Sequence, residues 1–201
     1  MEYIISSVIG YIIGCFNPAY YIGKLYGYED IREEGSGNAG ASNIGLVVGK
    51  NIGFAVAVMD ICKAIFAMYL AGTVCSKIKY AKIVAGAFAI TGHMFPVNMH
   101  FEGGKGLACF MGMILAMSWK MFLVFGAAVV IITLVTDYIA IGTIVASVVY
   151  PAYIYIISSA WIQPAIICAA TVLILIKHRE NIKRIISGKE IGLRKTMGVK
   201  Q

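Results

Sequence analysis

Long apolar runs separated by short polar segments dominate the hydrophobic pattern of this chain. A helix needs about twenty residues to cross the hydrocarbon core of a bilayer. The pattern predicts seven transmembrane helices, over residues 3–25, 52–75, 81–97, 105–118, 121–137, 139–158 and 160–177. The third, fourth, fifth and seventh runs are short, which is typical of helices that stop inside the protein around a polar site or cross at a tilt.

Composition supports an integral membrane protein. Hydrophobic residues make up 60% of the 201 residues, and charged residues make up 13%, about half the usual share of a soluble domain. The mean hydropathy is +0.82, which excludes an ordinary soluble domain. Because the sequence contains no internal repeat and no low-complexity segment, we expect one domain over residues 1–201, with an all-α polytopic helix bundle as its fold class.

The formal net charge of +7 is concentrated near the C-terminus. The basic residues there are Lys177, Arg179, Lys183, Arg184, Lys189, Arg194, Lys195 and Lys200. A basic cluster beside an apolar span marks the cytoplasmic side of a membrane, so we expect a cytoplasmic tail over 178–201 and an N-terminus on the outside. The lysines at 77, 79 and 82 oppose this topology. The short tail suits anionic lipid headgroups, and we do not expect a nucleic-acid partner.

The five cysteines give no sign of a metal or redox site. They are widely spaced without a C-x-x-C pair, and they lie in or beside apolar runs, so we interpret them as packing residues. The opening segment MEYIISSVIGYIIG lacks a basic region and an obvious cleavage site, so we expect a retained first helix rather than a secretory signal.

Three polar islands interrupt the apolar chain. Island 1 is GSGNAGASN (Gly35 to Asn43), island 2 is GHMFPVNMHFEGGKG (Gly92 to Gly106), and island 3 is HRENIKRIISGKE (His178 to Glu190). On the predicted topology all three reach the cytoplasmic face. This convergence is the main indication of a functional site, and it does not depend on recognising any motif.

Island 1 begins with GSGNAG, which fits the G-x-G-x-x-G pattern of a dinucleotide-binding turn. That turn requires a buried strand before it, and the charged segment YEDIREE precedes it here, so we reject a nicotinamide or flavin site. Glycines allow backbone N–H groups to approach an anion, and neutral side chains add hydrogen-bond partners. The candidates in island 1 are Gly35, Ser36, Gly37, Asn38 and Asn43, although an ordinary turn is the simpler interpretation of these residues alone.

Island 2 places Lys105 between glycines at the start of an apolar helix. The helix N-terminus and the ammonium group would both attract phosphate there. The candidates in island 2 are His93, Gly103, Gly104, Lys105 and Gly106. In island 3, His178 and Asn181 are three residues apart, so they would share one face of a helix. Together the islands predict an anion site at the membrane surface, for phosphate.

Several of these residues also have structural interpretations. Lys105 could extend to lipid headgroups, and His93 could be a core histidine with satisfied hydrogen bonds. We interpret His100 as structural, and the intramembrane residues Asp60 and Lys63 as a packing or folding device. With three histidines and no carboxylate cluster, the sequence gives poor support to a metal site, and it contains no Walker, zincin or nucleophile-elbow motif.

All three islands resemble the motifs of one family, the bacterial membrane acyl-phosphate:glycerol-3-phosphate acyltransferases known as the PlsY family. GSGNAGASN is similar to the first family motif, GHMFPVNMHFEGGKG to the second and HRENIKRIISGKE to the third. The leading YIIGCFNPAYYIGKL also resembles the family's first helix, so the resemblance covers nearly the whole chain in order.

The resemblance implies a seven-helix enzyme of the bacterial inner membrane with its site on the cytoplasmic side. It implies transfer of a fatty acyl chain from acyl phosphate to the 1-hydroxyl of glycerol 3-phosphate, giving lysophosphatidic acid and phosphate without a cofactor. The expected substrate-site residues are Ser36, Asn38, Lys105, His178 and Asn181, with His93 close by. Lys105 would neutralise phosphate charge, Ser36 and Asn38 would hydrogen-bond around it, and His178 and Asn181 would orient the glycerol backbone.

Two positions depart from the family pattern. Leu46 stands where the family commonly has an arginine, and Glu102 stands where it has the first lysine of FKGGKG. Both changes remove positive charge from the expected anion site, which predicts weak binding of glycerol 3-phosphate unless a cation such as Lys50 or Arg179 compensates. They also leave an alternative open, a relative of altered specificity or without catalysis that binds or transports an anionic metabolite.

Overall fold

In the computed structural model of the protein, residues 1–158 and 160–196 are described, and they form helices and turns without a strand. The all-α prediction is therefore confirmed for these ranges. The chain divides into two compact units, Met1–Met117 (unit 1) and Ser118–Gln201 (unit 2), which we describe separately. Lys200 and the rest of the predicted tail beyond residue 196 lie outside the described residues.

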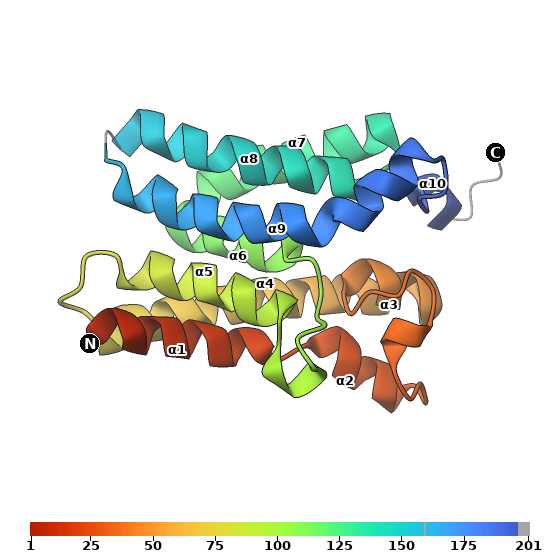
Figure 1. The fold of residues 1–201 in the computed structure, drawn as a ribbon, viewed down its shortest axis with the longest axis horizontal. Coiled ribbons are helices and arrows are strands. Elements are labelled where there is room, and N and C mark those ends of the chain that lie inside the picture. The colour runs from red at the N-terminus through yellow and green to blue at the C-terminus, as the bar shows by residue number, and fades with distance from the viewer. Residues whose placement is uncertain (159, 197–201) are drawn as a thin grey trace. The chain divides into compact units, whose positions relative to one another are not determined.

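The helices follow the apolar runs closely (Figure 1). Unit 1 contains α1 (Glu2–Cys15), α2 (Pro18–Leu25), the 3-10 helix η1 (Ile31–Glu33), α3 (Ala41–Val47), α4 (Lys50–Val74), α5 (Ala81–Met94), the 3-10 helix η2 (Val97–Met99) and α6 (Leu107–Met117). Unit 2 contains α7 (Trp119–Thr136), α8 (Ile139–Ser158), α9 (Ile162–Ile186) and the short α10 (Leu193–Thr196).

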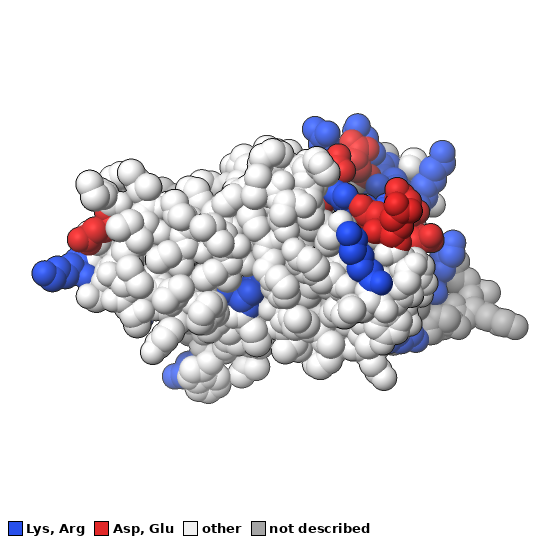
Figure 2. Space-filling model, turned by 90° about the horizontal axis from the view of Figure 1, so that it is seen from below, with Lys and Arg blue, Asp and Glu red and all other residues white. Residues whose placement is uncertain are grey.

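Among the described residues, five segments are long and apolar enough to cross a membrane: the α1–α2 segment, α4, α7, α8 and α9. The two remaining predicted spans are α5 and α6, with 14 and 11 residues. The prediction that some helices are short is confirmed for these two, while the count of seven crossing helices stays a prediction. Most of the surface visible in Figure 2 is uncharged, and the Lys, Arg, Asp and Glu side chains in that view gather in a few groups.

The first apolar run contains a break that its hydrophobic pattern does not reveal. Helix α1 ends at Cys15, and α2 begins at Pro18, a residue that fits the first turn of a helix because it needs no N–H partner. Between them, Asn17 accepts a hydrogen bond from the N–H of Tyr20 (3.0 Å) and donates to the carbonyl oxygen of Ala39 (3.0 Å). The buried Asn17 therefore caps α2 and also holds island 1.

Small residues bring α1 and α5 together within unit 1. A β-carbon added to Gly10 or Gly14 would collide with the backbone of α5 at Ala85 or Ala89. Such close backbone approach is typical of membrane helices, whose association depends on packing and not on the exclusion of water. The α1–α5 pair fixes the position of island 2, which follows the end of α5.

In unit 2, α9 is longer than the sequence predicts. The apolar run ends at residue 177, but the helix continues to Ile186 and carries the first part of island 3 on its last turns. Charged residues with good helix propensity thus extend the helix beyond its apolar part, while the cytoplasmic tail over 178–201 stays a prediction.

Candidate active site

Island 1 is held in shape by the buried side chain of Asn43. Its Oδ1 accepts hydrogen bonds from the N–H (2.6 Å) and the hydroxyl (3.1 Å) of Ser36. Its Nδ2 donates to the carbonyl oxygens of Ile31 (2.8 Å) and Glu34 (3.0 Å). The side chain of Asn43 thus supports the loop from inside, whereas its direct contact with a substrate stays a prediction.

The glycines of island 1 are explained by this support. Gly35 has a φ of 59°, in the left-handed region, and a β-carbon there would collide with Asn43 Oδ1. The result is a turn that leaves Ser36 and Gly37 exposed and Asn38 half-buried. Ser36 and Asn38 are therefore accessible to a ligand, as their predicted role requires.

Island 2 folds back on the end of α5. The N–H of Gly103 donates to the carbonyl oxygen of Met94 (3.1 Å), and the N–H of Gly104 donates to that of His93 (3.0 Å). A β-carbon on Gly103 would collide with His93 O, and one on Gly104 would collide with the imidazole ring of His93. Both N–H groups therefore cap α5, and packing against His93 requires glycine at both positions, while the part of Gly103 and Gly104 in phosphate binding stays a prediction.

Lys105 lies where the sequence places it, two residues before α6 begins at Leu107. Its side chain is half-buried, and the following Gly106 has a φ of 91°. The N-terminus of α6 and the ammonium group are therefore adjacent in the chain, which is the arrangement that attracts a phosphate group.

Arg32, on η1 just before island 1, holds the backbone of island 2, a role that the sequence did not suggest. Its guanidinium pairs with Asp30 (2.6 Å) and donates to the carbonyl oxygens of Met99 (3.0 Å) and Glu102 (3.1 Å). Hydrogen bonds from Arg32 lower the pKa of the Asp30 carboxyl, and Asp30 in turn raises the pKa of Arg32. The ion pair with Asp30 holds the side chain of Arg32 in place, and Arg32 in turn holds the backbone of island 2.

The same arginine accounts for one departure from the family pattern. The carboxylate of Glu102 lies 3.5 Å from Arg32 Nη1, and 76% of its side chain is exposed. A compensating cation therefore exists, and it is Arg32, which the sequence-based prediction did not name. The other departure, Leu46, lies on α3 with 37% of its surface exposed.

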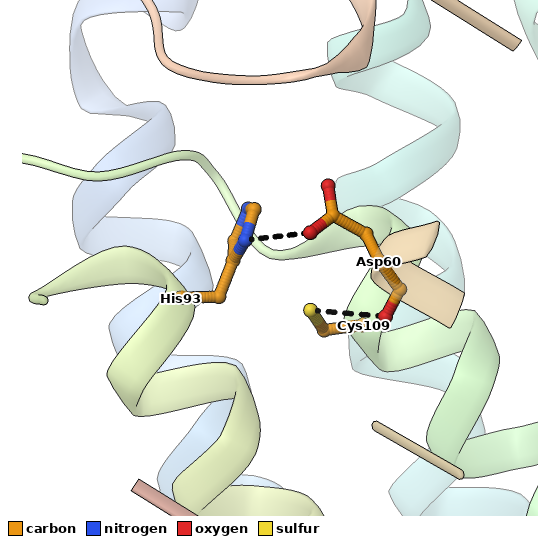
Figure 3. Close-up of side chains that lie close together, drawn as sticks. All are labelled: Asp60, His93 and Cys109. Carbon is orange, nitrogen blue, oxygen red and sulfur yellow. Dashed lines mark hydrogen bonds and ion pairs between the residues drawn. The ribbon is translucent and has the colours of Figure 1, made fainter. Parts of the chain in front are cut away.

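Beneath island 2 lies a buried cluster formed by Asp60, Lys63 and His93. Lys63 Nζ lies 2.7 Å from Asp60 Oδ1 and 2.9 Å from His93 Nδ1, and it donates to the carbonyl oxygen of Phe16 (2.5 Å). His93 Nδ1 is 3.2 Å from Asp60 Oδ1, and the imidazole and the carboxylate face each other in Figure 3. Lys63 was not among the predicted site residues, and no local sequence signal pairs it with His93.

This cluster also contains possible metal ligands. Atoms of Asp60, His93 and Cys109 that could bind a metal lie within 4.8 Å of one another, and all three residues are buried. However, Lys63 Nζ contacts both Asp60 and His93, so an ammonium cation already supplies the positive charge. Cys109 Sγ contacts the carbonyl oxygen of Asp60 at 3.5 Å (Figure 3). The donor set therefore fits an ion-paired cluster better than a metal.

In unit 2, His178 and Asn181 lie on one buried face of α9, which confirms the prediction from their spacing. They are 2% and 3% exposed. His178 Nδ1 lies 2.8 Å from the carbonyl oxygen of Ile174, and a carbonyl can only accept, so Nδ1 carries a proton. When the ring is neutral, Nε2 is therefore the hydrogen-bond acceptor of His178.

Asn181 is oriented by the end of island 3. Its Nδ2 donates to Glu190 Oε1 (2.5 Å), and Glu190 Oε2 accepts from Arg184 Nε (2.6 Å). No hydrogen-bond partner of the buried Oδ1 is found among the described residues. The amide is thus turned so that its oxygen remains an acceptor for a ligand.

The predicted site residues divide between the two units. Unit 1 holds those of islands 1 and 2, which Arg32 and the ring of His93 bring together: Gly35, Ser36, Gly37, Asn38, Asn43, His93, Gly103, Gly104, Lys105 and Gly106. Unit 2 holds His178 and Asn181, which share a buried face.

The described residues define an all-helical membrane protein whose lysine before α6 and two glycine-rich loops suit a phosphate group. Comparison with known proteins defines the family. The profile described as "Glycerol-3-phosphate acyltransferase" matches residues 4–188, and the chain belongs to this family.

Individual relatives agree. Glycerol-3-phosphate acyltransferase 1 of Oceanobacillus iheyensis is 34% identical over 210 residues, which is 100% of this chain and 99% of that protein. The glycerol-3-phosphate acyltransferase of Staphylococcus saprophyticus is 36% identical over 202 residues, covering 94% and 97% of the two chains. The crystal structure of PlsY, an integral membrane glycerol 3-phosphate acyltransferase, in its glycerol 3-phosphate form has a TM-score of 0.89 at 26% identity, with both chains fully covered.

Proposed function

We propose that this protein transfers a fatty acyl chain from acyl phosphate to the 1-hydroxyl of glycerol 3-phosphate in phospholipid biosynthesis. The hydroxyl oxygen would form a bond to the acyl carbon as the bond from that carbon to phosphate breaks. The hydroxyl proton would leave with phosphate or water, and the products would be lysophosphatidic acid and inorganic phosphate. Family membership supports the acceptor, and the three motifs support the donor by resemblance.

One observation in the structure carries this proposal furthest, the position of Lys105 directly before α6. An ammonium group beside a helix N-terminus is suited to a phosphate group on the donor, the acceptor or the leaving group. Ser36 and Asn38 are accessible on a loop that Asn43 holds, so they can add neutral hydrogen bonds.

The glycerol backbone is assigned to island 3. His178 Nε2 and Asn181 Oδ1 are both acceptor atoms on one face of α9, and a glycerol hydroxyl is a donor to either. Acyl phosphate is an activated mixed anhydride, so orientation and neutralisation of charge can supply much of the rate. We propose no metal and no organic cofactor.

The proposed setting is the bacterial inner membrane, with the N-terminus outside and the basic C-terminal segment in the cytoplasm near anionic lipids. The basic residues of unit 2 and the positive-inside rule support this topology. A reporter fused after residue 201 should be cytoplasmic, and activity of a C-terminal reporter in the periplasm would contradict the topology without affecting the proposed reaction.

The proposed reaction is tested with purified protein, palmitoyl phosphate and glycerol 3-phosphate. We expect phosphate release that depends on glycerol 3-phosphate, with lysophosphatidic acid identified by mass spectrometry. Palmitoyl-CoA should not replace palmitoyl phosphate as the donor. If no lysophosphatidic acid forms, and phosphate release does not respond to glycerol 3-phosphate, the proposal is wrong.

The Lys105→Met variant tests the observation that carries the proposal. Loss of one hydrogen bond to a charged group costs about 1.5–3 kcal/mol, so turnover should fall about ten- to one hundred-fold. Lys77→Met is the matched control, since Lys77 is exposed in the loop between α4 and α5. Near-normal turnover of Lys105→Met at saturating substrate would show that Lys105 only contacts lipid headgroups.

An altered substrate remains the second candidate because of Leu46, whose position on α3 lacks the family's arginine. Glu102 no longer supports this alternative, since it pairs with Arg32. A panel of anionic acceptors in the same assay decides between the two candidates. A different acceptor that reacts when glycerol 3-phosphate does not would favour altered specificity.

A further inference from the structure

The ammonium group of Lys63 has three acceptors around it. Its Nζ lies 2.5 Å from Phe16 O, 2.7 Å from Asp60 Oδ1 and 2.9 Å from His93 Nδ1. A lysine ammonium has three N–H donors and no acceptor. The carbonyl of Phe16 accepts one of these N–H groups. Asp60 Oδ1 balances the charge as an ion pair, and no hydrogen-bond partner of it is found among the described residues. Because an ammonium can only donate, a hydrogen bond between Lys63 Nζ and His93 Nδ1 makes Nδ1 the acceptor.

This arrangement determines which nitrogen of His93 carries the proton. If Nδ1 accepts from Lys63, the proton of the neutral ring must be on Nε2. The opposite tautomer would direct Nδ1–H at Asp60 Oδ1, 3.2 Å away, but it would also place an N–H against the ammonium of Lys63 at 2.9 Å. Asp60 thus acts through Lys63, whose charge it balances.

The protonated nitrogen lies where the two glycine-rich islands meet. A β-carbon on Gly104 would collide with His93 Nε2 and would also lie 2.9 Å from the carbonyl oxygen of Ala39, so island 2 and island 1 both reach this point. The residue after Gly104 is Lys105. His93 is 3% exposed, and no hydrogen bond of its Nε2 is found among the described residues.

We propose that Lys63, supported by Asp60, fixes His93 as an Nε2–H donor, and that this N–H binds a phosphate group at the junction of islands 1 and 2. His93 is then a substrate-binding residue, and Lys63 and Asp60 are positioning residues. This inference rests on the proposed function, because that function supplies the phosphate. The phosphate belongs either to the acceptor or to the acyl donor, and the two KM values distinguish these sources.

The tautomer is measured on the unaltered protein. Nitrogen NMR of histidine-labelled protein in lipid bilayers reports the protonation of each ring nitrogen, and His100→Gln and His178→Gln assign the three signals. We expect His93 to carry its proton on Nε2, and we expect that nitrogen's signal to shift when glycerol 3-phosphate or palmitoyl phosphate is added. A proton on Nδ1, or an Nε2 signal that responds to neither compound, would overturn the proposal.

Two substitutions of His93 separate binding from structure. The amide nitrogen of Gln reaches about as far as imidazole Nε2, whereas the amide of Asn stands in for Nδ1 and can contact only Lys63. We expect His93→Asn to raise one KM about ten- to one hundred-fold with a smaller change in kcat, and His93→Gln to restore part of that loss. The exposed His100 provides the control, His100→Gln, which should keep the normal KM values.

The opposite order would overturn the inference. If His93→Asn is as active as the unaltered protein and His93→Gln is not, the only role of His93 is to accept the hydrogen bond from Lys63. Normal KM values for both variants would exclude any contact with phosphate. If a variant does not fold, the NMR measurement on the unaltered protein still decides. Failure of the proposed function looks different, because the unaltered protein would then make no lysophosphatidic acid at all.

Discussion

Two charged clusters in unit 1 support the same loop from different surroundings. The inner cluster, Asp60, Lys63 and His93, lies under island 2 with side chains at most 5% exposed. The outer cluster, formed by residues 30, 32 and 102, lies at the surface, with the last carboxylate 76% exposed. The two clusters carry similar charges, but the inner cluster is shielded from solvent and the outer cluster is in contact with it.

This difference shows that buried and exposed charge pairs contribute to the stability of the fold in different ways. In the inner cluster each charge depends on the others, since an unpaired ion inside a membrane protein is very unfavourable. In the outer cluster water can replace the Glu102 contact, and the connection between the loops depends on the bonds from Arg32 to backbone carbonyls. Four predictions test this contrast.

The largest effect is expected for Lys63→Met. It leaves Asp60 buried without its cation, which should destabilise the fold by about 3–5 kcal/mol. Thermal unfolding of the detergent-purified protein measures the loss. The double variant Asp60→Leu, Lys63→Met should recover much of the stability, because no unpaired charge remains. If the single variant is as stable as the unaltered protein, the inner cluster is not an interdependent ion pair.

A smaller effect is expected for Arg32→Ala, which removes hydrogen bonds to Asp30, Met99 and Glu102. The expected loss is about 1.5–3 kcal/mol, local to the connection between the islands. Hydrogen exchange should then increase over residues 97–104, and the KM for the phosphate substrate should rise. The control is Arg179→Ala, because Arg179 is 72% exposed on α9. If hydrogen exchange over residues 97–104 is unchanged in Arg32→Ala, Arg32 does not hold island 2 as proposed.

The pH dependence of the outer cluster follows from Asp30. Hydrogen bonds from Arg32 lower its pKa, so its contribution to stability is present above the ordinary aspartate value of about 3.9 and is lost as pH falls through the lowered value. The difference in thermal stability between the unaltered protein and Asp30→Asn should be constant from pH 8 to about 5 and should shrink below about 4. A difference that shrinks between pH 8 and 6 would identify another group.

The smallest effect is expected for Glu102→Lys. The sequence alone predicts that Glu102 weakens binding of glycerol 3-phosphate, but the structure pairs Glu102 with Arg32 at the exposed surface. An exposed ion pair contributes about 0–1 kcal/mol, so KM should change by less than about fivefold. High salt should reduce the change further. A change of tenfold or more in KM would show that Glu102 acts directly on the substrate.

The apolar pattern predicted the helices well because lipid-facing and buried residues must both be apolar across a membrane helix. It did not predict the break at Asn17, since Pro18 is equally compatible with a helix that starts there. It also ended the last span at residue 177, because hydropathy detects only the apolar part of a helix. Helix α9 continues beyond that point with charged residues to Ile186.

The candidate site was predicted only in part. The spacing of His178 and Asn181 gave their shared face, because neighbours on one helix follow from helical geometry. The pairing of Lys63 with His93 and the reach of Arg32 to Met99 join residues distant in sequence, so no local pattern encodes them. Glycines 103 and 104 were assigned to anion binding, although packing against α5 also requires glycine.

The short helices of unit 1 also have a consequence for the surrounding lipid. Helices α5 and α6 have 14 and 11 residues, so they extend over about 21 Å and about 17 Å. The hydrocarbon core of a bilayer is about 30 Å thick. The acyl chains beside this pair must therefore shorten or tilt to match it, and the headgroup layer bends toward the helix ends. If the proposed reaction is correct, this bilayer shape would bring the water-soluble acceptor and the lipid-soluble acyl donor to similar depths.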